Sequence, residues 1–159
     1  MDGTKELPKE IVRLIKKQGF VIVSSLNEEG RIHSSAKGVV GIDESGRVFI
    51  IDLYQACTYN NLQKNPVVTV TFFDEHKFEG YALQGKAKIV KKKDIAASVM
   101  AEWEDKIIQR ISKRMIKNLQ AGNASSYHPE ASFPHPKYLI EIDVEKIIDL
   151  APEQLKKHA

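Results

Sequence analysis

The sequence of 159 residues contains a single cysteine, and this scarcity excludes several classes of protein. Cys57 has no second cysteine to pair with, so an intramolecular disulfide is impossible and we expect a reducing, cytoplasmic setting. A zinc site built on several cysteines is excluded for the same reason, and no two histidines stand four residues apart on a predicted helix. We therefore expect no metal site.

Long apolar runs are lacking as well. No stretch reaches the roughly 18 consecutive apolar residues that a membrane-spanning helix needs. The first ten residues are polar and charged, without the apolar centre of a signal peptide. We expect a globular protein with no membrane partner.

A strong excess of one charge is also missing, since 24 Lys and Arg stand against 21 Asp and Glu, for a net charge of +3. The charges are spread along the chain, which argues against a nucleic-acid partner. One lysine cluster, at 86–93, could attract phosphates, and the alternative is a solvated strand face that runs into a turn. Gly-rich dinucleotide and P-loop fingerprints do not occur.

What the sequence does contain is a succession of short apolar, β-branched segments separated by turns such as Asn27–Gly30 and Asp43–Gly46. A later segment has apolar residues at helical spacing without interruption by Gly or Pro. The expected strands are 20–26, 31–42, 47–53, 67–73, 79–90 and 138–144, and the expected helices are 8–18, 56–64 and 94–120.

These elements predict a mainly β fold with flanking helices, a six-stranded antiparallel split β-barrel in a single domain over 1–159. Its core would cover about 7–92, followed by the long helix at about 94–120 and the final strand at about 138–144. The apolar stripe of the long helix, which includes Trp103, is interpreted as core or dimer contact.

The first candidate for a functional site is the segment 33–38 in the second strand. Strand alternation places His33, Ser35 and Lys37 on one face, which brings hydroxyl and ammonium donors together. Gly38 and Gly41 would allow a bulge or the close approach of a ligand. The alternative interpretation is a polar stripe that faces solvent.

The second candidate is the segment 53–66, where a strand leads directly into a helix. Free N–H groups and the helix dipole favour an anion at such a helix start, and Thr58 adds a hydroxyl. The alternative is that Thr58 or a neighbour only caps the helix. Together, the two segments could form two walls of one phosphate site.

These motifs, in this order, resemble the pyridoxamine 5'-phosphate oxidase-like family of FMN-binding split barrels. The resemblance covers about 7–92. It consists of the opening helix, the Ser-x-Lys strand, the apolar strand 48–51, the helix signature Thr58, Asn61, Leu62, Asn65, Pro66 and the strand 80–87.

The resemblance implies FMN as cofactor and a homodimer with a flavin at the subunit interface. It places Ser34, Ser35 and Lys37 near the flavin phosphate and ribityl chain. It further implies that Ile50, Ile51 and Asp52 lie along the isoalloxazine edge, that Thr58 holds the phosphate, and that Gln84 reaches the flavin.

One departure from the family pattern concerns the phosphate. Relatives commonly carry a lysine just before the Thr58 position and often an arginine just after it, whereas this chain has Cys57 and Tyr59. Cys57 therefore stands at a cofactor-binding position without the charge that relatives place there.

The function that the resemblance implies is an FMN-dependent oxidoreductase of unknown substrate with a small-molecule redox partner. The alternatives are a non-enzymatic flavin carrier or sensor, and a haem-binding split barrel with a histidine ligand. A true pyridoxamine phosphate oxidase is not expected, because that enzyme grips its substrate with arginine and histidine near its C-terminus. This chain has no arginine after Arg114.

Overall fold

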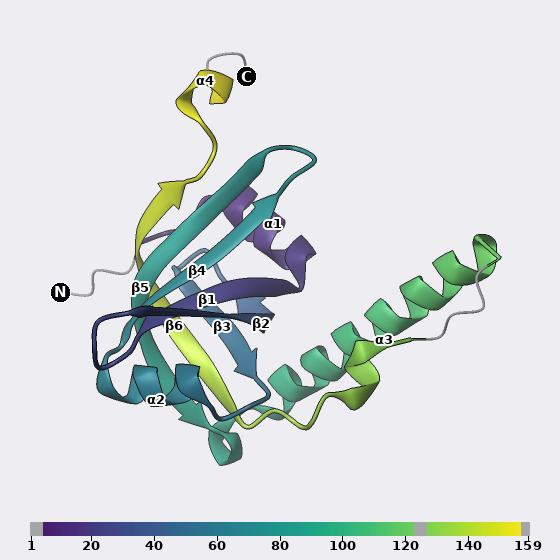
Figure 1. Cartoon of the computed structure of the whole chain (residues 1–159), viewed down its shortest axis with the longest axis horizontal. Coiled ribbons are helices and arrows are strands. Elements are labelled where there is room, and N and C mark those ends of the chain that lie inside the picture. Colours follow the sequence, from purple (N-terminus) through teal and green to yellow (C-terminus); the bar gives the residue numbers. More distant parts are fainter. Residues whose placement is uncertain (1–4, 123–126, 157–159) are drawn as a thin grey trace.

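The computed structural model describes residues 5–122 and 127–156 of the chain. Within these residues, six antiparallel strands form a closed barrel in the spatial order β1-β2-β3-β6-β5-β4 (Figure 1). The strands are β1 (Phe20–Leu26), β2 (Ile32–Ile42), β3 (Arg47–Asp52), β4 (Val67–Asp74), β5 (Glu79–Lys91) and β6 (Tyr138–Asp149). The predicted six-stranded antiparallel barrel with flanking helices is therefore confirmed.

Strand alternation creates the barrel interior, because successive side chains point to opposite faces. Val21 and Val23 of β1 are buried, whereas Ile22 between them is 44% exposed. In β3 the alternation gives way to burial on both faces. Ile50 belongs to the barrel core, and Ile51 belongs to a second apolar cluster outside the barrel. The continuously apolar run 48–51 is thus explained by two different cores.

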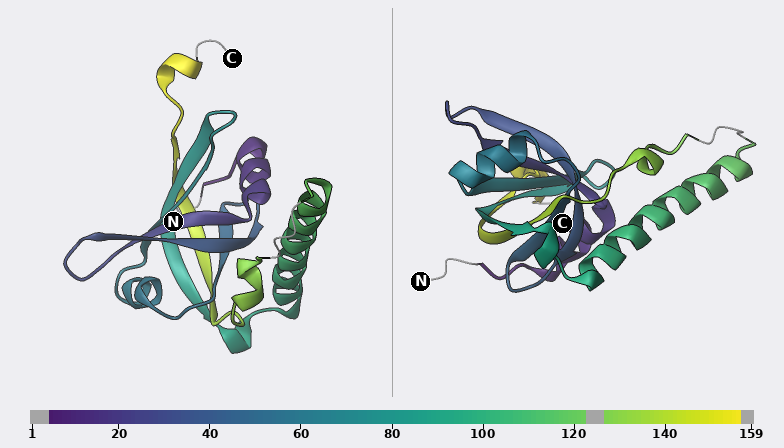
Figure 2. Two further views of the ribbon diagram at one scale, coloured as in Figure 1. Left: turned by 45° about the vertical axis from the view of Figure 1, so that its right-hand side comes forward. Right: turned by 90° about the horizontal axis from the view of Figure 1, so that it is seen from below.

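Two helices close the barrel at opposite ends (Figures 1 and 2). Helix α1 (Lys9–Gln18) inserts Ile11 and Ile15 into the core and ends at Gly19, whose φ of 67° places it in the left-handed region. Helix α2 (Cys57–Lys64) contributes Leu62 to the same core. Because α2 follows β3 closely in the chain, the start of α2 lies beside the end of β3.

The second cluster lies between the barrel and helix α3 (Ala97–Gln120), which follows the 3₁₀ turn η1 (Lys92–Asp94). Trp103 of α3 packs directly on Gly38, where a Cβ atom would come within 2.1 Å of the indole ring. The close approach expected at Gly38 is therefore made by a tryptophan ring. The far half of α3 extends away from the barrel (Figure 1).

Strand β6 is longer than the predicted 138–144, and the helix at its end, α4 (Glu153–Lys156), was not predicted. The register of β6 against β5 shifts between Gln84 and Gly85, so Glu145 is an extra residue in a bulge. A Cβ at Gly85 would lie 2.0 Å from the Asp143 carbonyl oxygen, so the bulge requires glycine there.

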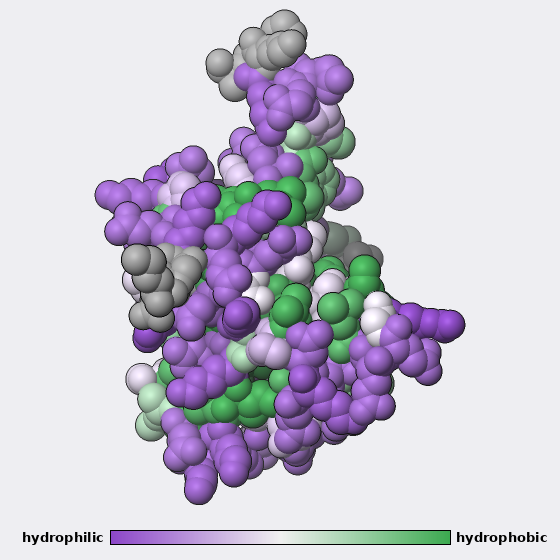
Figure 3. All heavy atoms as spheres, turned by 90° about the vertical axis from the view of Figure 1, so that its left-hand side faces the viewer, coloured by the Kyte–Doolittle hydropathy of each residue, from purple (hydrophilic) through white to green (hydrophobic). Residues whose placement is uncertain are grey.

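The face seen in Figure 3 is largely hydrophilic, and apolar side chains emerge between the hydrophilic ones. Among the helices of the described residues, none has the length and apolar character needed to cross a membrane.

Candidate functional site

A buried carboxylate at the end of β3 organises the candidate site. Asp52 is 1% exposed, and its Oδ1 atom accepts a hydrogen bond of 2.7 Å from the ammonium group of Lys37 on β2. The Tyr138 hydroxyl, on β6, donates to Oδ2 of the same carboxylate. Burial, and then this hydrogen bond to Asp52, raise the pKa of Tyr138 above its usual value, so Tyr138 remains a neutral donor. Asp52 is thus held by donors from both neighbouring strands.

A pair of hydroxyl groups lies beside β2, two residues before Lys37 in the sequence. Ser35 Oγ and Thr58 Oγ1 are 3.1 Å apart, and Thr58 is 1% exposed. Thr58 lies in the first turn of α2, and Ala56 before this helix offers no side-chain acceptor to the first-turn N–H groups. Asn61 fixes α2 on β1, because its Nδ2 donates to Ser25 Oγ at 3.1 Å. Two hydroxyls and an uncapped helix start therefore face one region.

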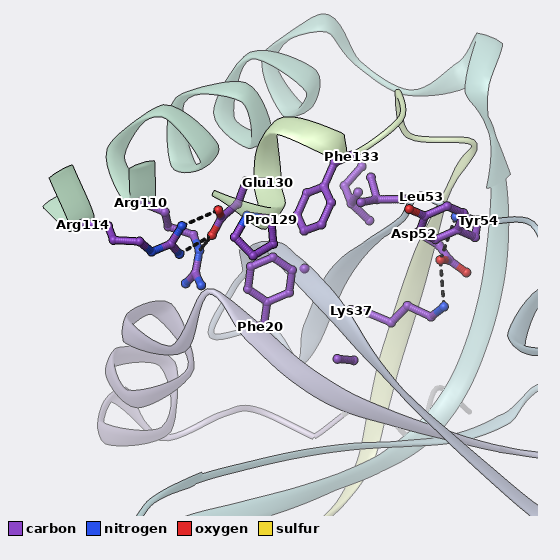
Figure 4. Close-up of a pocket in the computed structure, with 13 residues that line it drawn as sticks. Phe20, Lys37, Asp52, Leu53, Tyr54, Arg110, Arg114, Pro129, Glu130 and Phe133 are labelled. Atoms are coloured by element: carbon purple, nitrogen blue, oxygen red, sulfur yellow. Dashed lines mark hydrogen bonds and ion pairs between the residues drawn. The ribbon is translucent and has the colours of Figure 1, made fainter. Parts of the chain in front are cut away.

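A cavity of about 390 Å³ opens beside Lys37 and Asp52 (Figure 4). Its walls come from β1, β2, the end of β3, α3 and the 3₁₀ turn η2 (Pro129–Ser132). The residues labelled in Figure 4 are Phe20, Lys37, Asp52, Leu53, Tyr54, Arg110, Arg114, Pro129, Glu130 and Phe133. Apolar and aromatic groups predominate, and ion-paired groups lie at each end, Lys37 with Asp52 at one and two arginines with Glu130 at the other.

The far wall is fixed by Glu130, which is 5% exposed. Arg114 donates to both oxygens of this carboxylate, at 2.6 and 2.7 Å, and Arg110 Nε donates to it at 3.3 Å. These hydrogen bonds, that of Arg114 first, lower the pKa of Glu130 to about 2. The clamp attaches η2 to α3 and so closes one side of the cavity.

The structure brings together some of the residues predicted for the site. Lys37, Ile51 and Asp52 line the cavity, and Ser35 and Thr58 form the hydroxyl pair next to it. Cys57, the first residue of α2, is exposed.

The remaining predicted residues lie elsewhere. The hydroxyl of Ser34 pairs with that of Ser24 at 2.8 Å. Ile50 is fully buried in the barrel interior, and Gln84 lies on β5 opposite Thr69. None of these three lines the cavity.

Sequence reasoning missed the wall formed by α3 and η2. No expected helix or strand falls within residues 121–137, of which 123–126 lie outside the described residues. One signal was available, because Arg110 and Arg114 stand four residues apart and so share a helix face. Nothing in the sequence indicated that Glu130 would meet them.

Comparison with known proteins bears on the fold and the family. The family model described as pyridoxamine 5'-phosphate oxidase matches residues 7–151. The solved structure of HupZ from Group A Streptococcus is similar at 18% identity and a TM-score of 0.60, over 91% of this chain and 94% of that one. No curated protein matches the chain by sequence.

Two further solved structures share the fold. A protein related to general stress protein 26 from Clostridium acetobutylicum has 16% identity and a TM-score of 0.57, over 94% of this chain and 99% of that one. A pyridoxamine 5'-phosphate oxidase-related, FMN-binding protein from Nostoc punctiforme has 14% identity and a TM-score of 0.53, over 89% and 80% of the two chains.

Proposed function

This chain belongs to the pyridoxamine 5'-phosphate oxidase family, and from that premise we propose that it binds FMN and acts as a flavin-dependent oxidoreductase. The observation that carries the proposal is the pair of hydroxyls on Ser35 and Thr58 at the uncapped start of α2, next to a cavity rich in aromatic groups. A phosphate needs hydrogen-bond donors such as these hydroxyls, and a flat ring system needs aromatic walls such as those of the cavity.

The phosphate end fits an anion without a dedicated cation. The first-turn N–H groups of α2 have no side-chain cap, and the positive end of the helix dipole lies there. The hydroxyls of Ser35 and Thr58 would supply two further donors. The ammonium group of Lys37 is already paired with Asp52, so its charge is largely offset. We expect phosphate binding to depend mainly on neutral donors.

The ring end fits an apolar, planar group. Phe20, Leu53 and Phe133 line the cavity, and its volume of about 390 Å³ is in the range of small-molecule sites. When bound, FMN would supply the electron-transfer chemistry. The chain itself would bind and orient the ring against Phe20 and Phe133, whose own rings meet edge-on at 6.2 Å, and keep the Lys37–Asp52 pair at its polar edge.

We further propose that the protein is a homodimer in which the partner completes the flavin site. The outer faces of β1, β2 and β4 expose several large apolar side chains that a monomer would leave in water. They are Ile22 at 44%, Ile32 at 75%, Val67 at 46% and Phe73 at 38% exposure. Burying them against a second copy would remove this apolar surface from solvent.

The absorbance spectrum of the purified protein tests the cofactor directly. FMN would give a two-band yellow spectrum, and mass spectrometry of the released compound would identify it. A Soret band would instead support the alternative of a haem-binding barrel. A colourless protein that does not bind added FMN would contradict the proposal.

An enzyme and a carrier are separated by the reactivity of the bound flavin. The holoprotein is mixed with a chemical reductant and then with a small-molecule acceptor, and flavin absorbance is followed over time. We expect repeated reduction and reoxidation with turnover of the acceptor. A flavin that stays bound but shows no turnover with any acceptor would support the alternative of a non-enzymatic carrier or sensor.

A further inference from the structure

A second cavity, of about 350 Å³, lies between the end of α1 and the middle of α3. Five of its lining residues are cationic: Lys16, Lys17, Lys106, Arg110 and Lys113. None of its lining residues carries an acidic side chain. This cavity is separate from the site proposed for FMN, although Phe20 and Arg110 line both cavities and so form a wall between them.

Most of this positive charge is not offset. Arg110 is paired with Glu130 at 3.3 Å, and Lys106 lies a loose 3.9 Å from Glu102. Within residues 5–122 and 127–156, Lys16, Lys17 and Lys113 make no ion pair. Lys16, Lys17 and Lys113 are exposed, so solvent screens part of their repulsion, but a hollow lined by one sign of charge still attracts a ligand of the opposite sign.

Helix electrostatics explains only part of the cluster. Lys16 and Lys17 lie in the last turn of α1, where cations interact favourably with the helix dipole. Lys106, Arg110 and Lys113 come from the middle of α3, where no such benefit exists. Their spacing of four and three residues puts all three on one face of that helix, toward α1.

Lys106 shows the repulsion within the cluster. Its Nζ atom donates a 2.7 Å hydrogen bond to the carbonyl oxygen of Val39, which holds the ammonium group near the cavity. Burial lowers the pKa of Lys106, Glu102 opposes that effect, and the nearby charge of Lys16 lowers the pKa further.

The floor of the cavity is aromatic. Trp103 is 4% exposed, and its ring meets that of Phe20 edge-on at 6.0 Å. The guanidinium group of Arg110 lies 4.7 Å from the centre of the Phe20 ring. The cations therefore stand around a fixed apolar base, an arrangement that suits a ligand with both a charged and an apolar part.

We propose that this cavity binds a phosphorylated small molecule with at least two negative charges, through a diphosphate or triphosphate group held by Lys17, Lys106 and Lys113. Lys106 and Lys113 would reach the phosphates from α3 and Lys17 from α1, so that the ligand bridges the two helices. The proposal does not depend on FMN, because none of the three lysines lines the FMN cavity.

Trp103 is the only tryptophan of the chain, and it lines the cavity, so its fluorescence reports occupancy. Inorganic pyrophosphate is titrated into the full-length protein, with inorganic phosphate as comparison. We expect pyrophosphate to change the Trp103 emission saturably and to bind more tightly than phosphate, with an affinity that falls as salt is added. No saturable response to pyrophosphate, by fluorescence or by calorimetry, would overturn the proposal.

Two double variants, each of which removes two positive charges, locate the site. Lys17→Gln with Lys113→Gln should weaken pyrophosphate binding roughly tenfold or more, since each removes a charge-assisted contact. Lys77→Gln with Lys88→Gln alters exposed residues outside the cavity and should leave the affinity within about twofold of wild type. Equal losses in both pairs would mean general charge attraction and would overturn the proposal.

Competition with FMN separates this proposal from the preceding one. Saturating FMN should leave pyrophosphate affinity unchanged, and Lys17→Gln with Lys113→Gln should leave FMN affinity unchanged. Displacement of pyrophosphate by FMN would place it at the start of α2 and would overturn the second site. A protein that binds pyrophosphate but no FMN would contradict only the proposed flavin function. NMR chemical-shift changes of the Gly19 amide and the Trp103 indole N–H on addition of pyrophosphate would locate the site in the wild-type protein, without any variant.

Discussion

At the scale of single residues, Asp52 is the centre of the candidate site. A carboxylate that is 1% exposed needs compensation for its lost hydration, and Lys37 and Tyr138 supply it from the two strands beside β3. Both members of the ion pair are buried, since the side chain of Lys37 is only 10% exposed. Removing one partner should therefore cost more than removing both.

A double-mutant cycle tests this dependence. Lys37→Met leaves Asp52 buried without its cation and should reduce the free energy of unfolding by about 3 kcal/mol. Lys37→Met combined with Asp52→Asn should cost less than Lys37→Met alone, because the neutral amide needs no cation. Urea denaturation of the four proteins measures the coupling. Additive losses would show that the two groups do not stabilise each other.

The ion pair was not foreseen from the sequence, although the face of Lys37 was. Period-two alternation puts Ser35 and Lys37 on one side of β2, and the 3.1 Å contact from Ser35 to Thr58 agrees with the prediction that segments 33–38 and 53–66 meet. Sequence alone could not show that Lys37 would face Asp52, because that depends on the stagger between neighbouring strands.

Cys57 allows a test of the phosphate position. It is the exposed first residue of α2, where relatives are expected to carry lysine. Cys57→Lys should lower the stability of the protein without ligand by about 0.3–1 kcal/mol, because a cation opposes the dipole there. With FMN, the new ion pair should tighten binding roughly tenfold, or about 1.4 kcal/mol.

Riboflavin, which lacks the phosphate, is the matched control for that substitution. Fluorescence quenching with both ligands should show the gain for FMN alone, and the gain should shrink in high salt. Unchanged or weaker FMN binding would show that Cys57 does not face the phosphate, and the placement of FMN along α2 would then be wrong.

At the scale of elements, patterns of period two and 3.6 predicted the strands and helices well, and long-range contacts explain the misses. The end of β6 was missed because the bulge at Glu145 interrupts the alternation before Ile147 and Ile148. The group that approaches Gly38 was missed because Trp103 lies on α3, more than 60 residues later in the chain. The turn η2 was missed because it is stabilised by Arg110 and Arg114 of another element.

The contact between β2 and α3 predicts a steric effect at Gly38. A Cβ there would come within 2.1 Å of the Trp103 ring, so Gly38→Ala should displace α3 and destabilise the protein by about 1–3 kcal/mol. Gly41→Ala is the control, since its Cβ would meet Phe49 at 3.2 Å, a milder contact. Thermal unfolding and the Trp103 emission maximum measure both effects. Equal stability of the two variants would show that α3 does not rest on Gly38.

The clamp between α3 and η2 should be visible in the pH dependence of stability. The folded pKa of Glu130, about 2, lies below its ordinary value of 4.5. The clamp therefore contributes fully above about pH 4.5, and its contribution falls as the pH drops from 4.5 to 2, because the unfolded chain takes up the proton first. Glu130→Gln should lose this part of the pH dependence and about 1–3 kcal/mol at neutral pH. Denaturant unfolding of both proteins across this pH range measures it, and an unchanged slope in Glu130→Gln would contradict the assignment.

At the scale of the whole molecule, α3 connects the two cavities. Arg110 contributes to the clamp on Glu130, lies over Phe20 and lines both hollows. A ligand that bridges α1 and α3 would thereby touch the outer wall of the cavity proposed for FMN. The barrel supplies the fixed strands at the site, and the long helix supplies the wall that sequence reasoning did not anticipate.

The whole molecule also carries the prediction of a homodimer. Light scattering should give twice the chain mass of 18.0 kDa, because the outer face of β1, β2 and β4 exposes apolar side chains. Ile22→Glu places a charge in that face and should yield a monomer that binds FMN at least tenfold more weakly, since the partner no longer completes the site.

Leu119→Glu distinguishes the strand face from the alternative surface on the long helix. Leu119 is 77% exposed on the half of α3 that extends from the barrel, so the substitution should leave the mass and the FMN affinity unchanged if the strands form the interface. A monomer from Leu119→Glu but not from Ile22→Glu would move the interface to α3. A monomeric Ile22→Glu protein with undiminished FMN affinity would mean that one chain holds the flavin alone, because a site shared between subunits cannot survive their separation.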